Sequence, residues 1–268
     1  MAIFDCFQYF NEDHIVDLRL NILNEHIDKF VIVESTVNHQ GQPKKLNFDI
    51  NKYQKFKDKI NYVVVDDTPE DIKRPHLGGE SLVEQHQRNS ILRGLSKSNE
   101  NDLIILSDVD EIPDLTKLNQ FSKKCKYAVF SQKAYAYKLN LLNESENNWH
   151  GSKICLRKNF KSPQWLRNLK FKKYPFWRID KPRSLQIIDN GGWHFAYLLD
   201  SKDISTKIKS FAHGEDNKKD NTDIDKIEGK MKNFLHPTKG FKLSKVKVDD
   251  TFPKYIVDNI SALEKWIA

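Results

Sequence analysis

The stretch 101–113 constrains the fold of this chain more than any other. Four consecutive aliphatic residues at 103–106 are followed by Asp108, Asp110 and Glu111, and then by a proline. A continuous apolar run of this length between polar residues is typical of a buried parallel strand. The carboxylates would then lie where the strand leaves the sheet, which is where open α/β sheets bind their ligands.

The two aspartates of this stretch predict a metal site. One residue separates Asp108 from Asp110, so both side chains project to the same side of an extended chain. Two carboxylates so close together repel each other unless a cation lies between them. Mg²⁺ or Mn²⁺ commonly bridges protein carboxylates to substrate phosphates. The alternative is a solvated acidic turn that caps the following helix.

Length and composition indicate a globular α/β protein with a strongly charged surface. The 268 residues suffice for one large domain or two small ones, and 38% of them are hydrophobic while 30% are charged. The formal net charge of +7 favours anionic ligands. Because the lysines are spread along the whole chain, we interpret them mainly as a solvated surface and expect no nucleic-acid partner.

The cysteines and the apolar stretches predict a cytoplasmic protein. Cys6, Cys125 and Cys155 are odd in number and widely spaced, so neither a disulfide framework nor a zinc site is indicated. The N-terminus lacks the pattern of a secretory signal, and no stretch approaches 18 apolar residues. We expect at most a peripheral association with the inner face of an anionic membrane.

Hydrophobic periodicity predicts alternating strands and helices before residue 113. The expected strands are 2–7, 30–34, 60–65 and 103–106, and the expected helices are 13–25, 51–59 and 81–97. This order predicts a mostly parallel sheet with helices on both faces.

The pattern changes after residue 113. The expected strands are 127–131, 133–142 and 153–156, and the expected helices are 115–123, 203–211, 223–234 and 253–267. The segment 165–183 combines aromatic and basic residues with several prolines. It is interpreted either as a wall of the substrate site or as ordinary core packing.

The stretch 187–195 is the second informative one. Gly191 and Gly192 allow a close approach of the backbone to a ligand, or a positive φ. Trp193 offers a face for stacking on a sugar ring, and His194 offers a metal ligand. The alternative for both side chains is packing inside the protein.

Six motifs occur in an order that resembles glycosyltransferase family 17. They are FNED with LRL within 10–20, VES at 33–35, QRN at 87–89, SDVDEIP at 107–113, GGWHF at 191–195 and SFAHGE at 210–215. The best-known members of this family are the β-1,4-mannosyl-glycoprotein N-acetylglucosaminyltransferases. The resemblance covers roughly residues 1 to 230.

The resemblance implies a single GT-A type domain that uses a nucleotide-sugar donor. This α/β fold has a Rossmann-like, mostly parallel central sheet with helices on both faces and a smaller mixed sheet on the acceptor side. We expect a nucleotide-sugar-binding half at 1–113, an acceptor-binding half at 114–235 and a C-terminal docking tail at 236–268. The implied donor is a UDP-sugar, with UDP-GlcNAc first, and the reaction inverts the anomeric carbon.

The resemblance and the residue types together define a set of candidate binding residues. The candidates for the nucleotide sugar are Asn11, Glu12, Glu34, Arg88, Asp108, Gly191, Gly192 and Trp193. The candidate ligands of Mn²⁺ or Mg²⁺ are Asp108, Asp110, His194 and His213. For Glu12 and Glu34 the alternative is a capping or salt-bridged carboxylate, and for Arg88 it is a surface position on a helix.

Inversion requires one general base within hydrogen-bond reach of the acceptor hydroxyl. The candidates are Asp189, Glu111 and Glu215. Asp189 ranks first because it precedes the two glycines on an expected strand end facing the cleft. We therefore expect Asp189→Asn to abolish transfer, whereas Glu111 could instead orient the donor sugar.

The chain departs from the family pattern in ways that bear on the acceptor. We see neither the membrane anchor nor the stem of the vertebrate members, so we do not carry over their N-glycan acceptor. We expect instead the hydroxyl of a surface polysaccharide or another glycoconjugate. The alternatives are a metal-dependent phosphoryl-transfer enzyme or nuclease that uses Asp108 and Asp110, and a non-catalytic glycan- or nucleic-acid-binding module.

Overall fold

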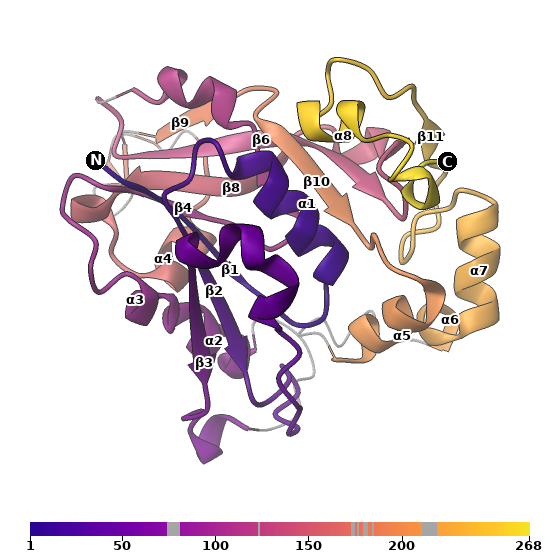
Figure 1. The fold of residues 1–268 in the computed structure, drawn as a ribbon, viewed down its shortest axis with the longest axis horizontal. Helices are drawn as coiled ribbons and strands as arrows, with labels where there is room; N and C mark the ends of the chain where they lie inside the picture. Colours follow the sequence, from indigo (N-terminus) through magenta and orange to yellow (C-terminus); the bar gives the residue numbers. More distant parts are fainter. Residues whose placement is uncertain are drawn as a thin grey trace.

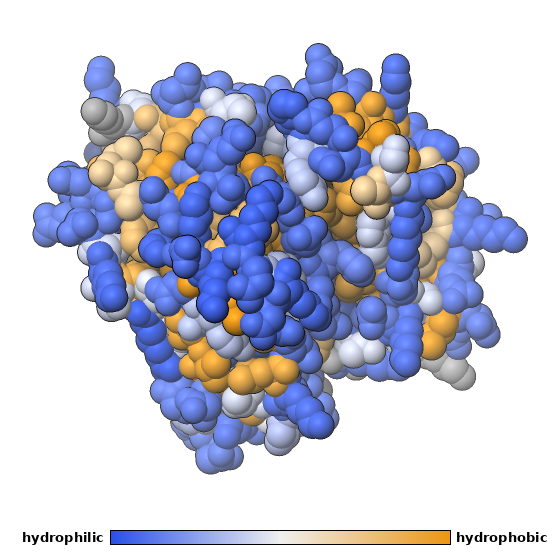
Figure 2. Space-filling view, in the orientation of Figure 1, coloured by the Kyte–Doolittle hydropathy of each residue, from blue (hydrophilic) through white to orange (hydrophobic). Residues whose placement is uncertain are grey.

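One large sheet forms the centre of the molecule, and helices cover both of its faces (Figure 1). The computed structural model describes residues 1–73, 81–122, 124–172, 175, 177–178, 182–183, 185–210 and 219–268. Within these residues the sheet has 11 strands. Hydrophilic side chains cover most of the face seen in Figure 2. This cover agrees with the interpretation of the scattered lysines as a solvated surface.

Four parallel strands form the half of the sheet predicted from the sequence. They are β1 (Ile3–Gln8), β2 (Lys29–Ser35), β3 (Ile60–Val65) and β4 (Leu103–Leu106). Their spatial order is β3-β2-β1-β4, so the chain moves outward from β1 in both directions. A ligand site is expected where the direction changes, at the carboxyl ends of β1 and β4.

The remaining strands extend this sheet as a mixed half. They are β5 (Glu111–Pro113), β6 (Tyr127–Ala136), β7 (Leu141–Leu142), β8 (Trp149–Leu156), β9 (Leu185–Ile188), β10 (Gly192–Ala196) and β11 (Ser244–Lys245). β8 lies antiparallel between β4 and β6, while β9 and β10 run parallel to β6. The prediction of separate strands at 127–131 and 133–142 is wrong. β6 is continuous to residue 136, and Tyr137, at a positive φ of 65°, ends it.

Helices pack on both faces of the parallel strands. The first face carries α1 (Asp13–Leu23), and the second carries α2 (Leu82–Asn89), α3 (Ile91–Gly94) and α4 (Pro163–Asn168). The 3₁₀ turns are η1 (Ile50–Lys59), η2 (Glu70–Ile72), η3 (Leu115–Gln120), η4 (Glu144–Glu146) and η5 (Arg157–Asn159). The strands are apolar on both sides because alternate residues enter opposite cores: Phe7 and Ile105 face α1, whereas Cys6 and Ile104 face α3 and α4.

A third apolar cluster joins the last helices to the end of β6. It contains residues of α5 (Ser201–Ser210) and α7 (Ile224–Lys232), with the short α6 (Lys219–Thr222) beside them. The expected helix 253–267 is broken into α8 (Lys254–Asp258) and the turn η7 (Glu264–Trp266), both packed in the core beneath α1. In the part of the chain that the structure describes, no helix has the length and apolar character needed to cross a membrane.

Candidate functional site

A cavity of about 410 Å³ opens at the carboxyl ends of β1, β2 and β4. One wall comes from the segments after β1 and β2 and from α2, and the floor is 108–110. The opposite wall contains Trp149, Arg167, His194, Lys207 and the segment 236–239. The expected docking tail therefore contributes its first residues to the site. A larger hollow of about 940 Å³ lies between α1, η3 and α8 and contains neither Asp108 nor Asp110.

A fully buried arginine holds the floor of the cavity from beneath. Arg19 of α1 binds both carboxylate oxygens of Asp5 on β1 at 2.6 Å. Its Nη1 also donates to the main-chain oxygens of Asp108 at 3.3 Å, Val109 at 3.2 Å and Glu111 at 2.7 Å. These carbonyls lie between the end of β4 and the start of β5, so the Arg19 guanidinium fixes the backbone that carries the two aspartates.

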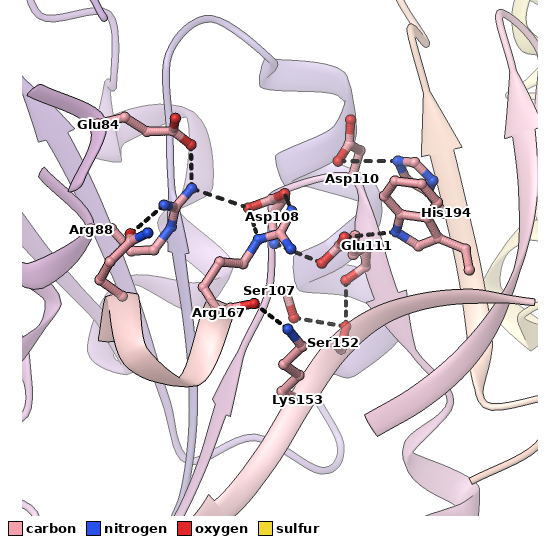
Figure 3. Close-up of polar contacts among 12 residues, drawn as sticks. Glu84, Arg88, Ser107, Asp108, Asp110, Glu111, Ser152, Lys153, Arg167 and His194 are labelled. Atoms are coloured by element: carbon pink, nitrogen blue, oxygen red, sulfur yellow. Dashed lines mark hydrogen bonds and ion pairs between the residues drawn. The ribbon is translucent and has the colours of Figure 1, made fainter. Parts of the chain in front are cut away.

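Asp108 is held in a network of ion pairs (Figure 3). Arg167 of α4 donates from Nη2 to Oδ2 at 2.6 Å and from Nε to Oδ1 at 3.3 Å, and Arg88 Nη2 lies 3.8 Å from Oδ1. Arg88 is itself buried and pairs with Glu84, one turn earlier on α2. Burial raises the pKa of the Asp108 carboxyl, but the charges of Arg167 and Arg88 outweigh this effect and hold the pKa well below its usual range.

Asp110 has looser partners. Its Oδ2 lies 3.4 Å from Lys207 Nζ of α5, and its Oδ1 lies 3.7 Å from Nε2 of His194 on β10. Lys207 also pairs with Glu12 at 3.2 Å. Burial lowers the pKa of the Lys207 ammonium, but the carboxylates of Glu12 and Asp110 outweigh burial and raise the pKa above its usual range. Lys207 therefore stays charged beside Asp110.

Glu111 supports the cavity without lining it. Its Oε2 accepts from the backbone N–H of Asp108 at 3.0 Å, and its Oε1 accepts from Nε1 of Trp149 at 2.8 Å. The Trp149 ring stacks on His194, with ring centroids 4.6 Å apart and 23° between the planes. Burial and the nearby Asp108 charge raise the pKa of the Glu111 carboxyl. Each oxygen accepts one hydrogen bond from the protein, so Glu111 positions Asp108 and Trp149, and its catalytic role stays a prediction.

The donor set beside the cavity fits a metal that arrives with its substrate. Among the described residues, no three His, Cys, Asp or Glu side chains gather as a ready metal cage. Asp110 Oδ1 and His194 Nε2 lie 3.7 Å apart and could together hold one ion, whose other ligands would then come from the substrate. Mg²⁺ and Mn²⁺ commonly use one or two carboxylates together with substrate phosphates. Nδ1 of His194 is buried and has no hydrogen-bond partner among the described residues, so none of these residues fixes its tautomer.

Glu34 lies away from the cavity, and the alternative reading of it as a salt-bridged carboxylate is correct. Its Oε1 accepts from Lys44 Nζ at 2.5 Å and from Asn47 N at 2.7 Å. Its Oε2 accepts from Phe48 N at 3.0 Å and from the Tyr62 hydroxyl at 2.8 Å. The fully buried Glu34 thus secures the loop after β2 and keeps no acceptor free for a nucleoside.

The other candidate for nucleoside contact, Glu12, does line the cavity, whereas its neighbour Asn11 does not. Oε2 of Glu12 accepts from the backbone N–H groups of Phe10 and Asn11 at 3.1 Å each. The second oxygen faces Lys207. Glu12 therefore stiffens the loop after β1, and its negative charge partly offsets the positive charge of Lys207 in the cavity.

The prediction that Asp189 faces the cleft is wrong. Asp189 is exposed on the turn between β9 and β10, and it does not line the cavity that holds Asp108 and Asp110. A general base must come within hydrogen-bond reach of the hydroxyl that it activates. The sequence placed Asp189 correctly beside a strand end, but that end belongs to β9 in the mixed half of the sheet.

The two glycines serve the sheet rather than a ligand. A Cβ on Gly191 would lie 2.6 Å from the Ile188 oxygen, and one on Gly192, at φ +142°, would lie 2.2 Å from the Ile112 oxygen. Trp193 is buried and donates from Nε1 to the Thr251 oxygen at 3.1 Å. These three residues do not line the cavity that holds Asp108 and Asp110, and Gly192 and Trp193 instead line the larger hollow between α1, η3 and α8. Their contact with the nucleotide sugar stays a prediction that this position does not favour.

Two candidates, His213 and Glu215, lie outside the described residues. Conversely, Arg167, Trp149 and Lys207 line the cavity although no sequence motif marks them as site residues. Arg167 has a partial signal, because it belongs to the basic aromatic segment 165–183, for which a substrate wall is one interpretation. Trp149 and Lys207 carry no local signal, because only the tertiary fold brings β8 and α5 to the cavity.

Comparison with solved structures finds similarity at low identity. A protein described as a glucose-1-phosphate thymidylyltransferase from Bacillus anthracis, in complex with sucrose, is 11% identical, with a TM-score of 0.38 over 70% of this chain and 87% of that one. Residues 1–349 of TarS from S. aureus are 12% identical, with a TM-score of 0.40 over 77% and 63%. A glycosyltransferase involved in glycosylation of the major capsid of PBCV-1 is 9% identical, with a TM-score of 0.33 over 70% and 82%.

Comparison with curated proteins gives no match. Comparison with protein families gives a match to glycosyltransferase family 17 over residues 1–233. This range contains the parallel half of the sheet, the 107–113 motif and β10. Because the match spans most of the 268 residues, the chain belongs to glycosyltransferase family 17, a family of sugar-transferring enzymes.

Proposed function

We propose that this protein is a metal-dependent, inverting glycosyltransferase that moves a sugar from a UDP-sugar to a hydroxyl of a glycan acceptor. GlcNAc is the first candidate for the sugar, and a surface polysaccharide or other glycoconjugate for the acceptor. The observation that carries the proposal is the pair Asp110 and His194, which faces a cavity at the carboxyl ends of parallel strands.

The charges around the cavity suit a nucleoside diphosphate. Its volume of about 410 Å³ is in the range of small-molecule sites. Lys44, Arg167 and Lys207 line it, and each is paired with a carboxylate in the ligand-free protein. A diphosphate that enters here can exchange places with some of these carboxylates, so its negative charge meets cations that are already in position.

Asp110 and His194 are the residues that would hold Mn²⁺ or Mg²⁺. When bound, the ion would neutralise charge that develops on the leaving diphosphate. Asp108 has a different role in this proposal from the one expected, because Arg167 occupies both of its oxygens. It fixes the Arg167 guanidinium at the cavity wall, where it can stabilise the departing UDP.

Three carboxylates are candidates for the general base that activates the acceptor hydroxyl. Asp189 lies outside the cavity, and both oxygens of Glu111 are occupied. Glu215, outside the described residues, stays a prediction as the general base. Inversion of the anomeric carbon likewise stays a proposal based on the family.

The competing functions find less support around the two aspartates. A metal-dependent nuclease or phosphoryl-transfer enzyme would need more carboxylates or imidazoles around one ion, yet the described neighbours of Asp108 are the cations Arg88 and Arg167. A non-catalytic glycan-binding module would need neither a metal nor a nucleotide.

The proposal is tested by donor screening. We expect release of UDP from one sugar nucleotide in a panel of UDP-GlcNAc, UDP-glucose and UDP-galactose, stimulated by Mn²⁺ and abolished by EDTA. Asp110→Asn should remove the stimulated activity, and the exposed Asp189→Asn is the matched control of equal charge change. Equal turnover with and without the metal, or turnover of none of these donors by the wild-type protein with a glycan panel, would contradict the proposal.

A further inference from the structure

A tight turn between α7 and β11 forms part of the cavity wall. An isolated β-bridge joins Leu235 to Lys242, the backbone N–H of His236 donates to the Phe241 oxygen at 2.7 Å, and the N–H of Gly240 donates to the His236 oxygen at 3.1 Å. Phe234, which precedes Leu235 of the bridge, has a positive φ of 53°. These bonds fix the backbone of His236. The family match ends at residue 233, so it does not cover this turn.

The ring of His236 has a defined tautomer. Its Nδ1 accepts from the backbone N–H groups of Thr238 at 3.3 Å and Lys239 at 3.2 Å, and the ring packs on Phe241 with centroids 4.5 Å apart. Since Nδ1 accepts these hydrogen bonds, the neutral ring carries its proton on Nε2. Burial lowers the pKa of His236 to about 4, so the ring is neutral at physiological pH.

Contacts from both sides hold the turn in place. Lys230 of α7 donates to the Pro237 oxygen at 2.6 Å, and Lys239 pairs with Glu146, three residues before Trp149. Trp149 in turn stacks on His194. Through this chain of contacts, His236 is fixed on the side of the cavity where the Asp110 and His194 pair lies.

The hydrogen-bonding capacity of His236 is used on one side of the ring only. The side chain is 7% exposed and lines the cavity. Among the described residues, no group accepts a hydrogen bond from its Nε2–H. An N–H donor that has a fixed direction and belongs to the lining of a cavity favours a ligand that supplies an oxygen acceptor.

We propose that His236 determines which sugar the protein accepts, by donating from Nε2–H to an oxygen of the sugar carried by the nucleotide. This proposal rests on the proposed function. The nucleoside belongs on the wall formed by the segments after β1 and β2, and the diphosphate belongs beside Asp110. The sugar then extends toward 236–239. A neutral Nε2–H cannot take up a proton, so His236 selects and positions the sugar and is not the base.

Two substitutions separate this role from a purely structural one. His236→Asn places an amide oxygen near the position of Nδ1, so it can still accept from Thr238 and Lys239 but has no donor at the position of Nε2. His236→Gln keeps a donor near that position and loses the acceptor for the turn. A structural role predicts that the Asn variant behaves like the wild type and that the Gln variant is impaired.

The experiment is calorimetric titration of both variants with UDP, GDP and their sugar derivatives, together with thermal unfolding. We expect His236→Asn to unfold near the wild-type temperature and to bind the free nucleotide normally. Its Kd for the sugar nucleotide that the wild type binds should rise by about fivefold to tenfold, the size expected for one lost hydrogen bond. His236→Gln should unfold at a lower temperature and keep more of the preference for the sugar nucleotide.

Three results would overturn the assignment. The Asn variant could bind free nucleotide and sugar nucleotide as the wild type does, it could weaken for both equally, or it could raise only the KM for the acceptor. If the wild-type protein bound no nucleotide and no sugar nucleotide, the proposed function itself would fail, and this proposal with it. Normal binding by the wild type with an unchanged Asn variant would remove only the role of His236.

Discussion

The two aspartates of the 107–113 motif differ in how the fold holds them. Asp108 lies 2.6 Å from Arg167 and 3.8 Å from Arg88, in a network that also includes Glu84. Asp110, two residues later, has as described partners the Lys207 ammonium at 3.4 Å and the His194 imidazole at 3.7 Å. Both line the same cavity. The fold thus holds one carboxylate by short ion pairs and the other by longer contacts.

This difference teaches that spacing alone does not assign a role. Asp108 and Asp110 share a side of the chain, as the sequence predicted, but α4 approaches the first and β10 the second. Arg19 binds the carbonyl of Asp108 and the carbonyls of the two residues that flank Asp110, while Glu111 accepts from the backbone N–H of Asp108. Substitution of a supporting residue should disturb the aspartates that it holds in place. Substitution of each aspartate alone should show whether the two have different roles.

The largest effect is expected for Arg19→Met, which removes the support shared by both aspartates. Asp5 would remain buried without its partner, and we expect the free energy of unfolding to fall by about 3–5 kcal/mol. Urea unfolding measures this loss. The double variant Arg19→Met with Asp5→Leu should recover part of the stability, since it removes the unpaired charge. A loss below about 1 kcal/mol for the single variant would contradict a supporting role.

Glu111→Gln should lower stability and leave the pH dependence of the activity unchanged. In the variant, the NH₂ group of the amide must face either the backbone N–H of Asp108 or the Nε1–H of Trp149, so one of these donors loses its acceptor. We therefore expect the free energy of unfolding to fall by about 2 kcal/mol. The pH profile of kcat/KM for the preferred donor should keep its acidic limb. Loss of that limb in a folded variant would instead identify Glu111 as the base.

Asp108→Asn should reveal the ion-pair network through its pH dependence. The folded-state pKa of Asp108 is depressed, so its stabilising contribution is present above the ordinary pKa of about 4 and disappears as the pH falls toward the folded-state value. The difference in unfolding free energy between wild type and variant should therefore be largest near pH 6 and shrink toward pH 3. Urea unfolding across this range tests it, and a difference independent of pH would argue against the network.

The smallest effect is expected for Asp189→Asn. The side chain is exposed and outside the cavity, so activity and stability should stay within about twofold and 0.5 kcal/mol of the wild type. Assays of UDP release measure the activity. Abolished transfer with normal donor binding would restore Asp189 as the base and would mean that the acceptor binds outside the cavity.

The parallel half of the fold was predictable because its signals are local. Apolar runs, helix periodicity and the cap at Ser81, whose hydroxyl accepts from the Glu84 N–H, give β1 to β4 and most of the helices between them. The mixed half was less predictable, because the pairing of β6 with β8, β9 and β10 joins residues far apart in the sequence. The extent of β6 and the break in the C-terminal helix depend on such contacts.

The presence of Asp108, Asp110 and His194 around one cavity was predictable because the motifs themselves provide these groups, whereas their roles stay predictions. The residue types of Glu34, Gly191 and Trp193 suit a ligand and a buried role equally well, and none of the three lines the cavity. Only the structure shows that Glu34 and Trp193 make hydrogen bonds within the protein and that neighbouring atoms leave no room for a side chain at Gly191. Arg167 and Lys207 were missed because their roles arise from the approach of α4 and α5 to the motif.

The central claim is that Asp110 with His194, and not Asp108, binds the metal that holds the nucleotide. Calorimetric titration of UDP with and without Mn²⁺ tests this claim in the wild type, Asp108→Asn and Asp110→Asn. We predict that Mn²⁺ raises the affinity for UDP by about tenfold or more in the wild type and in Asp108→Asn, and has little effect in Asp110→Asn. A wild-type affinity unchanged by Mn²⁺, or a loss of the metal effect in Asp108→Asn as complete as in Asp110→Asn, would contradict the claim.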